Sequence, residues 1–232
     1  MGGAEAAMGR KRPLLLQVAI DKAESLGVIA QVRGIADIIE IGTPLLKRFG
    51  IGAIATAREL CPDTPILADT KTVDAGDLEA EMVFGAGARL MTVLSSTSSA
   101  THAAVGKVAA RFGAFIVVDT ITESGKPELL PAGATFPESF AYVGVHSPTD
   151  TRSAGDRSIA HIDAVSDIRR RGFRVALAGG LGPETLDAVL EAEPEIVIVG
   201  SAITGADDPR RVARWIKDRL RNPGRGWPSD AR

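Results

Sequence analysis

Eight short apolar runs recur along the chain, and segments of helical periodicity lie between them. The runs cover residues 14–20, 37–41, 66–69, 90–94, 115–118, 142–145, 174–178 and 196–199. Most are continuously hydrophobic, which is typical of parallel strands buried on both faces. The clearest helical patterns cover residues 75–86, 158–171 and 209–220. This alternation predicts a parallel sheet, and eight similar repeats predict that it closes into a single-domain (β/α)8 TIM barrel of the α/β class.

An open Rossmann sheet is the main alternative fold. Such a sheet needs a glycine-rich turn directly after its first strand in order to receive a dinucleotide. The residues after the first run are Asp21, Lys22, Ala23 and Glu24, with no glycine among them. The sequence therefore favours the closed barrel and argues against a dinucleotide site.

The barrel is expected to occupy most of the 232 residues, a length close to the ~250 of a typical barrel. Residues 1–12 lack the apolar run that a signal peptide contains, and we expect them to form a disordered leader. Residues 222–232 predict a flexible tail, which leaves residues 13–221 for the catalytic domain. The stretch 123–141 is rich in proline, so we expect an irregular fifth crossover.

Composition excludes several classes of function. The formal net charge is −2, which provides no basic surface for nucleic acid. No apolar run approaches the length that spans a bilayer. The single cysteine, Cys61, excludes an intrachain disulfide and fits a reducing cytoplasm. We therefore expect a cytoplasmic protein that acts on a small molecule, with no nucleic-acid or membrane partner.

Ionisable residues gather at the C-terminal ends of the predicted strands. Because these ends meet at one rim of a barrel, barrel enzymes place their chemistry there. Strands one, two, three, five and six end at or are followed by Asp21, Glu40, Asp69, Lys71, Asp74, Asp119 and His146. We predict that Asp21 and Asp119 bind sugar hydroxyls or pair with Lys71. A helix-capping role is the alternative for Asp119.

Small residues take the place of charged ones after the last two predicted strands. The seventh strand is followed by Gly179 and Gly180, and the eighth by Gly200 and Ser201. In many barrels the loops at these positions hold phosphate through backbone N–H groups. Glycine lets the backbone approach an anion closely. We predict a phosphate site here, and the alternative is that these glycines only form tight turns.

The most informative motif is the D-x-K-x-x-D segment of Asp69, Lys71 and Asp74. Buried charges of opposite sign must compensate one another. A lysine held between carboxylates keeps its proton and can stabilise or protonate a developing enolate. The alternative is a solvated charge cluster in a loop. Glu40, one strand earlier, favours the functional interpretation, because Glu40 and Asp69 together offer hard oxygen ligands for Mg²⁺.

The three histidines receive different interpretations. His146 follows the sixth predicted strand on the same rim, which favours a role in proton transfer or oxygen binding. His102 and His161 fall in predicted helices away from that rim. We expect both of them to be surface residues.

Seven segments together resemble the 3-hexulose-6-phosphate synthase family, within the orotidine 5′-monophosphate decarboxylase suprafamily. They read IEIGTPLL at 39–46, ILADTKTVDAGDLEA at 66–80, MTVLSS at 91–96, VVD at 117–119, VGVHSPTD at 143–150, LAGGL at 177–181 and IVIVGSAIT at 196–204. They occur in the family's order from about residue 14 to residue 220. A close relative of this family is 3-keto-L-gulonate-6-phosphate decarboxylase.

The resemblance implies a Mg²⁺-dependent, homodimeric barrel that joins formaldehyde to D-ribulose 5-phosphate. The product is D-arabino-hex-3-ulose 6-phosphate, and the reaction is reversible and proceeds through a Mg-stabilised enediolate. The resemblance also assigns roles to residues. Glu40 and Asp69 match the metal ligands, and Lys71 matches the lysine near the enediolate. Asp74 matches the aspartate that enters the partner's active site, and His146 matches the histidine after strand six. The phosphate-binding residues are matched by Gly180, Gly200 and Ser201.

Departures from the family pattern leave two other functions open. Thr149 stands where the decarboxylase carries an arginine, which favours the synthase. Pro148, the proline-rich stretch 123–141 and the VVDTIT segment at 117–122 differ from a typical synthase. These changes surround the predicted substrate pocket and leave another sugar phosphate or another aldehyde open. The second hypothesis is a decarboxylase or related lyase acting on a keto-sugar phosphate such as 3-keto-L-gulonate 6-phosphate. The third is a non-catalytic sugar-phosphate-binding protein, against which the charge set at the rim argues.

Overall fold

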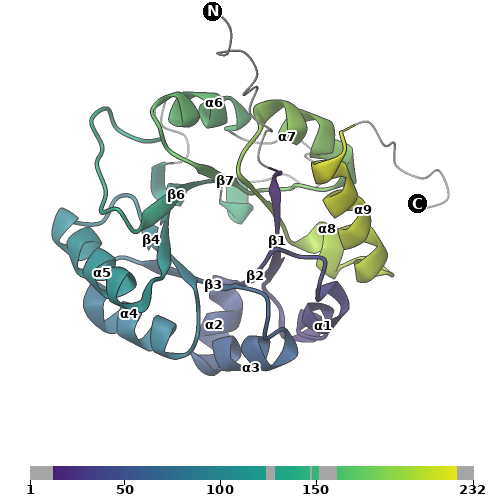
Figure 1. The fold of residues 1–232 in the computed structure, drawn as a ribbon, viewed down its shortest axis with the longest axis horizontal. Coiled ribbons are helices and arrows are strands. Elements are labelled where there is room, and N and C mark those ends of the chain that lie inside the picture. The colour runs from purple at the N-terminus through teal and green to yellow at the C-terminus, as the bar shows by residue number, and fades with distance from the viewer. Residues whose placement is uncertain (1–12, 124–128, 147, 152–160, 224–232) are drawn as a thin grey trace, which may run out of the picture.

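The computed structural model describes residues 13–123, 129–146, 148–151 and 161–223 of the chain. Eight parallel strands close into a barrel in sequence order, with the last strand paired to the first (Figure 1). The strands are β1 Leu15–Ile20, β2 Ile38–Ile41, β3 Ile66–Thr72, β4 Leu90–Leu94, β5 Phe115–Asp119, β6 Phe140–Val145, β7 Val175–Leu177 and β8 Ile196–Val199. The predicted (β/α)8 fold is confirmed.

Helices surround the barrel and follow most strands (Figure 1). The α-helices are α1 Val28–Val32, α2 Thr43–Phe49, α3 Gly52–Leu60, α4 Gly76–Gly85, α5 Ser99–Phe112, α6 Ile162–Arg170, α7 Leu186–Ala192, α8 Ser201–Thr204 and α9 Pro209–Arg221. Short 3-10 turns occupy η1 Ala23–Ser25, η2 Ile121–Glu123, η3 Thr149–Thr151 and η4 Pro183–Thr185. Among the described residues, no helix combines the length and the apolar character required to cross a bilayer.

Two apolar layers hold the fold together. The larger layer packs the outer faces of the strands against the helices, and it explains why the strands read as continuous hydrophobic runs. The smaller one fills the barrel interior with Ile38, Leu67, Leu90, Val117, Ala176 and Ile196. This inner layer closes the barrel from below and leaves the C-terminal ends of the strands to form a cavity.

The sequence-based boundaries agree with the structure for most elements and fail at β3. The predicted strand ends at residue 69, whereas β3 continues to Thr72 and carries Lys71 within it. The register against β4 shifts between Ala68 and Thr72, because Lys71 has a left-handed backbone with φ 49°. Residues 158–160 of the predicted sixth helix, the leader over 1–12 and residues 224–232 of the predicted tail lie outside the described residues.

The fifth crossover is irregular, as predicted, over the residues that the structure describes. After η2, residues 129–139 run to β6 without a helix. Phe136 stacks on Phe140 with ring centroids 5.6 Å apart, and Pro137 lies against Gly106 of α5. This segment covers the side of α5 that a regular helix would otherwise cover.

The interpretation of His102 as a surface residue is wrong. Its side chain is buried, and its ring lies edge-on to Phe136 and Phe140. The Nε2 atom is 3.0 Å from the carbonyl oxygen of Leu94, the last residue of β4. The irregular crossover packs over α5 and buries the histidine, which the helical pattern alone does not reveal. His161 is half-buried and stands at the N-terminal boundary of α6 rather than inside a helix.

Candidate active site

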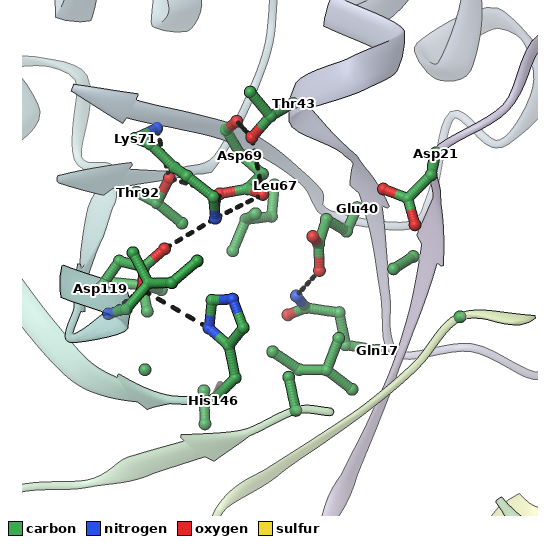
Figure 2. A pocket seen from close by; sticks show the side chains of 18 of the residues that line it. Gln17, Asp21, Glu40, Thr43, Leu67, Asp69, Lys71, Thr92, Asp119 and His146 are labelled. Atoms are coloured by element: carbon green, nitrogen blue, oxygen red, sulfur yellow. Dashed lines mark hydrogen bonds and ion pairs between the residues drawn. The ribbon is translucent and has the colours of Figure 1, made fainter. Parts of the chain in front are cut away.

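A cavity of about 540 Å³ opens at the C-terminal ends of the strands. It is lined by residues from all eight strands and the loops that follow them, and the close view in Figure 2 shows their side chains turned toward one another. Its polar and small lining residues include Gln17, Asp21, Glu40, Thr43, Asp69, Lys71, Thr92, Asp119, His146 and Gly200. Seven of the residues predicted from the sequence therefore meet at one site.

Lys71 is the centre of the charge network in this cavity. Its Nζ donates to Oδ1 and Oδ2 of Asp69 at 3.0 and 2.9 Å, and to Oδ2 of Asp119 at 2.8 Å. Burial alone would lower the pKa of Lys71, but the two carboxylates outweigh it and raise that pKa above its usual value. Lys71 therefore stays protonated throughout the neutral range.

Two threonine hydroxyls fix the carboxylate of Asp69. Thr92 Oγ1 donates to Asp69 Oδ1 at 2.8 Å and accepts the backbone N–H of Lys71 at 2.8 Å. Thr43 Oγ1, at the start of α2, lies 2.9 Å from Asp69 Oδ2 and 2.6 Å from its carbonyl oxygen. Each carboxylate oxygen thus faces a hydroxyl and the ammonium group, so the orientation of Asp69 is set from three sides.

Glu40 has a different environment, because it is buried beside a neutral amide. Gln17 Nε2 donates to Glu40 Oε2 at 2.5 Å. Burial and, second, the charge of Asp69 raise the pKa of Glu40 to about 8, although the hydrogen bond from Gln17 acts in the opposite direction. The same two causes, partial burial and the charge of Asp69, raise the pKa of Asp21 at the mouth.

His146 and Asp119 lie side by side beneath Lys71 (Figure 2). His146 Nδ1 is 3.5 Å from Asp119 Oδ1. Burial lowers the pKa of His146 below its usual value, although the charge of Asp119 acts against this shift. The neutral imidazole that results can accept a proton. Asp119 Oδ1 also accepts the N–H of Ile121 at 2.9 Å, so Asp119 both pairs with Lys71 and caps η2.

Four predicted site residues lie outside the lining of this cavity. Asp74 is exposed on the loop between β3 and α4. Gly179 and Gly180 follow β7 with φ of 103° and 70°, and Ser201 begins α8 directly after Gly200. Both loops belong to the same rim. The positive φ values also agree with the tight-turn alternative, and the structure leaves the phosphate assignment a prediction.

Sequence reasoning missed Gln17, Thr43 and Thr92. A signal for two of them is present, because Gln17 and Thr92 are polar residues inside otherwise apolar strands. A buried strand has no reason to carry such a residue unless its side chain meets a polar partner. Thr43 carries no comparable signal, since threonine is common at helix starts.

The carboxylates of this site are chemically suited to a hard cation. Asp21, Glu40 and Asp69 face one cavity, and the pKa values of the first two are raised by burial and by the charge of the third. A divalent cation relieves this unfavourable concentration of negative charge. Among the described residues no group of three or more His, Cys, Asp or Glu side chains forms a preassembled metal cage. A cation here would take its other ligands from water or substrate, as Mg²⁺ commonly does.

The fold and the site define a class of protein, namely a (β/α)8-barrel enzyme whose ionisable residues meet at the C-terminal mouth of the barrel. Residues 14–216 match the orotidine 5′-phosphate decarboxylase / HUMPS family. The chain belongs to this family.

Individual relatives cover nearly the whole described chain. A 3-hexulose-6-phosphate synthase of Mycobacterium gastri is 36% identical over 209 residues, which are 87% of this chain and 97% of the relative. The crystal structure of 3-hexulose-6-phosphate synthase from Salmonella typhimurium has a TM-score of 0.75 and 33% identity, over 89% of this chain and 98% of that one. The crystal structure of KGPDC from Streptococcus mutans has a TM-score of 0.72 and 27% identity, over 90% of this chain and 98% of that one.

Proposed function

We propose that this protein condenses formaldehyde with D-ribulose 5-phosphate to give D-arabino-hex-3-ulose 6-phosphate, in a reversible aldol-type reaction. The observation that carries the proposal is the ammonium group of Lys71, which is held by Asp69 and Asp119 beside a neutral His146. Similarity to relatives named 3-hexulose-6-phosphate synthase supports this reaction over decarboxylation.

The chemistry requires a base, a stabilised negative oxygen and a fixed substrate. His146 takes the proton from the carbon beside the ketose carbonyl, and the C–H electron pair forms the enediolate. Lys71 places a fixed positive charge near the oxygen on which negative charge develops. The enediolate carbon then forms the new bond to formaldehyde, whose oxygen takes up the proton that His146 removed, and the neutral imidazole is restored. Gly179, Gly180, Gly200 and Ser201 hold the phosphate away from the reacting carbon, which fixes the substrate in position.

Mg²⁺ is the proposed cofactor, with Glu40 and Asp69 as its protein ligands. When bound, such an ion polarises the carbonyl oxygen and acidifies the neighbouring C–H bond. The support from this chain is the pair of carboxylates on adjacent strands β2 and β3, of which Glu40 has a pKa raised to about 8 by burial and by Asp69.

A homodimer in which Asp74 enters the partner's cavity is the proposed assembly. Asp74 is exposed and lies outside its own cavity. Three large apolar side chains of the preceding residue and of the following helix, α4, are also exposed: Val73 by 59%, Leu78 by 60% and Met82 by 49%. Leu78 and Met82 share one face of α4, because they are four residues apart. We call Val73, Leu78 and Met82 the α4 face; apolar groups gathered in this way favour burial against a second copy.

The cytoplasm is the proposed compartment. A phosphorylated sugar is a metabolite of the cell interior, and the single cysteine, Cys61, is buried as a free thiol.

The decisive test is formaldehyde fixation. The protein is incubated with D-ribulose 5-phosphate and ¹³C-labelled formaldehyde, with Mg²⁺ or with EDTA, and the hexulose 6-phosphate is followed by NMR. We expect labelled product only with Mg²⁺. Release of CO₂ from 3-keto-L-gulonate 6-phosphate without any formaldehyde fixation would establish the decarboxylase alternative instead. Tight binding of the sugar phosphate with neither reaction would establish a binding protein.

A further inference from the structure

Gln17 is a polar residue in the floor of the cavity, where its neighbours are apolar. It belongs to β1, and its side chain is only 1% exposed. In register beside it are Ile38 of β2 and Ile198 of β8. Burying an amide in such surroundings is unfavourable unless its polar atoms are paired. The function proposed above does not use this residue.

One half of the amide is committed to Glu40. The Nε2 atom donates to Glu40 Oε2 at 2.5 Å, across the pair of strands β1 and β2. When Glu40 is ionised, as a cation ligand must be, the opposite orientation of the amide would place two acceptor oxygens against each other. The carboxylate therefore fixes which way the amide points, and the amide in turn fixes the carboxylate.

The other half of the amide has no partner within the described part of the chain. Gln17 Oε1 is buried and accepts no hydrogen bond there. Leaving a buried acceptor unpaired is unfavourable. Gln17 lines the cavity, so a hydroxyl group or water bound there can donate a hydrogen bond to Oε1 after a small rotation of the Gln17 side chain.

We propose that Gln17 is a positioning residue that holds the carboxylate of Glu40 for the cation and offers its amide oxygen to a hydroxyl or water bound in the cavity. This inference rests on the cation site of the proposed function, but not on the identity of the aldehyde. A neutral amide suits this role, because it orients Glu40 without supplying a charge that competes with the cation. Residues that orient a metal ligand in this way commonly change metal affinity about 10–100-fold when they are replaced.

The test compares cation binding and turnover in Gln17→Met, which keeps the size of the side chain but removes donor and acceptor. Binding is measured with Mn²⁺ alone, as the decrease of the free-ion EPR signal. We expect the Mn²⁺ Kd to rise about tenfold or more. We also expect kcat to fall while KM for D-ribulose 5-phosphate stays within about threefold, because the phosphate is held elsewhere.

The matched control is Ile198→Met, which changes an apolar neighbour in the same layer of the barrel. It reports what altered packing alone does, and we expect its Mn²⁺ Kd to stay within about twofold of the unaltered chain. Thermal unfolding shows that each variant folds. If Gln17→Met does not fold, Gln17→Asn keeps the amide but is too short to reach Glu40, and it should weaken Mn²⁺ binding in the same way.

An unchanged Mn²⁺ Kd in a folded Gln17→Met or Gln17→Asn protein would overturn the inference, and Gln17 would then only fill space. The two proposals fail separately. A chain that fixes no formaldehyde but loses Mn²⁺ affinity on substitution of Gln17 would refute the proposed reaction and keep the role of Gln17.

Discussion

At the residue scale, the site depends on a backbone conformation that most residues avoid. Lys71 has φ 49°, which costs a non-glycine residue about 1–3 kcal/mol. Its N–H is held by Thr92 Oγ1, and its ammonium group by Asp69 and Asp119. The hydrogen bonds that offset the strain are the same ones that aim the lysine into the cavity. The strained backbone of Lys71 is therefore part of how its ammonium group is placed in the cavity.

Thr92 should therefore be essential for turnover although it carries no charge. Thr92→Val keeps the shape but leaves the N–H of Lys71 and one oxygen of Asp69 without the hydroxyl, at a cost of about 1–3 kcal/mol. If that cost appears in the transition state, kcat falls about 10–100-fold. Thr92→Ser keeps the hydroxyl and should stay within about threefold of the unaltered enzyme. Equal turnover in the valine and serine variants would contradict this role.

Glu40 makes the stability of the metal-free protein dependent on pH. The folded chain holds this proton to a pKa of about 8, against the usual 4.5, so between these values the folded state binds more protons than the unfolded one. The stability that this group contributes is complete below about pH 4.5 and is lost as the pH rises to about 8. Glu40→Gln removes this loss of stability, because glutamine does not ionise.

Urea unfolding in EDTA measures this effect. The free energy of unfolding of Glu40→Gln should exceed that of the unaltered chain by an amount that grows from about pH 5 to about pH 8 and is constant above it. A difference that does not change with pH would mean that Glu40 titrates normally.

At the scale of elements, the irregular crossover packs closely against α5. A Cβ atom on Gly106 would lie 2.7 Å from Cβ and 2.9 Å from Cγ of Pro137. We expect Gly106→Ala to lower the free energy of unfolding by about 1–3 kcal/mol, because a rigid proline cannot move aside without shifting the segment. Gly52→Ala at the start of α3 is the control, since nothing lies within 4 Å of its added Cβ. We expect this variant to lose no stability, because alanine is the better helix former. Chemical denaturation of both variants provides the measurement.

The sequence predicts elements well where burial alone decides them. Buried parallel strands are apolar on both faces, so the runs at 90–94 and 196–199 give β4 and β8 with the observed bounds. The end of β3 is missed because its polar residues are paired with side chains and backbone atoms far away in the sequence. The hydroxyl of Thr70, for example, donates to the carbonyl of Thr92.

In the candidate site, too, some residues could be predicted from the sequence and others could not. The charged rim follows from strand order, since each strand end carries its ionisable residue to the same mouth. The partners that orient those charges do not follow from it. The pairing of Gln17 with Glu40 spans 23 residues, and that of Lys71 with Asp119 spans 48. Such pairs depend on barrel register and on side-chain direction, which a single sequence does not specify.

At the scale of the whole molecule, one predicted site residue of the rim, Asp74, lies on the outer surface of the barrel. The barrel converges its strand ends on a single cavity, yet Asp74 and the α4 face lie on the outer surface. A monomer would expose this apolar surface to water. A twofold dimer would bury it and could bring each Asp74 to the other copy, since such an interface contacts the same patch on both subunits.

Mixing two inactive variants tests whether Asp74 acts across the dimer. Asp74→Ala and Lys71→Ala should each lack activity as homodimers, the first through the loss of an aspartate from the partner's site and the second through the loss of the ammonium group. In a mixed dimer, one cavity combines the intact Lys71 of its own chain with the intact Asp74 of the partner. Unfolding and refolding an equal mixture should restore about a quarter of the original activity, because half the dimers are mixed and each has one complete site. If Asp74 acts within its own chain, no complete site can form, and the refolded mixture stays inactive.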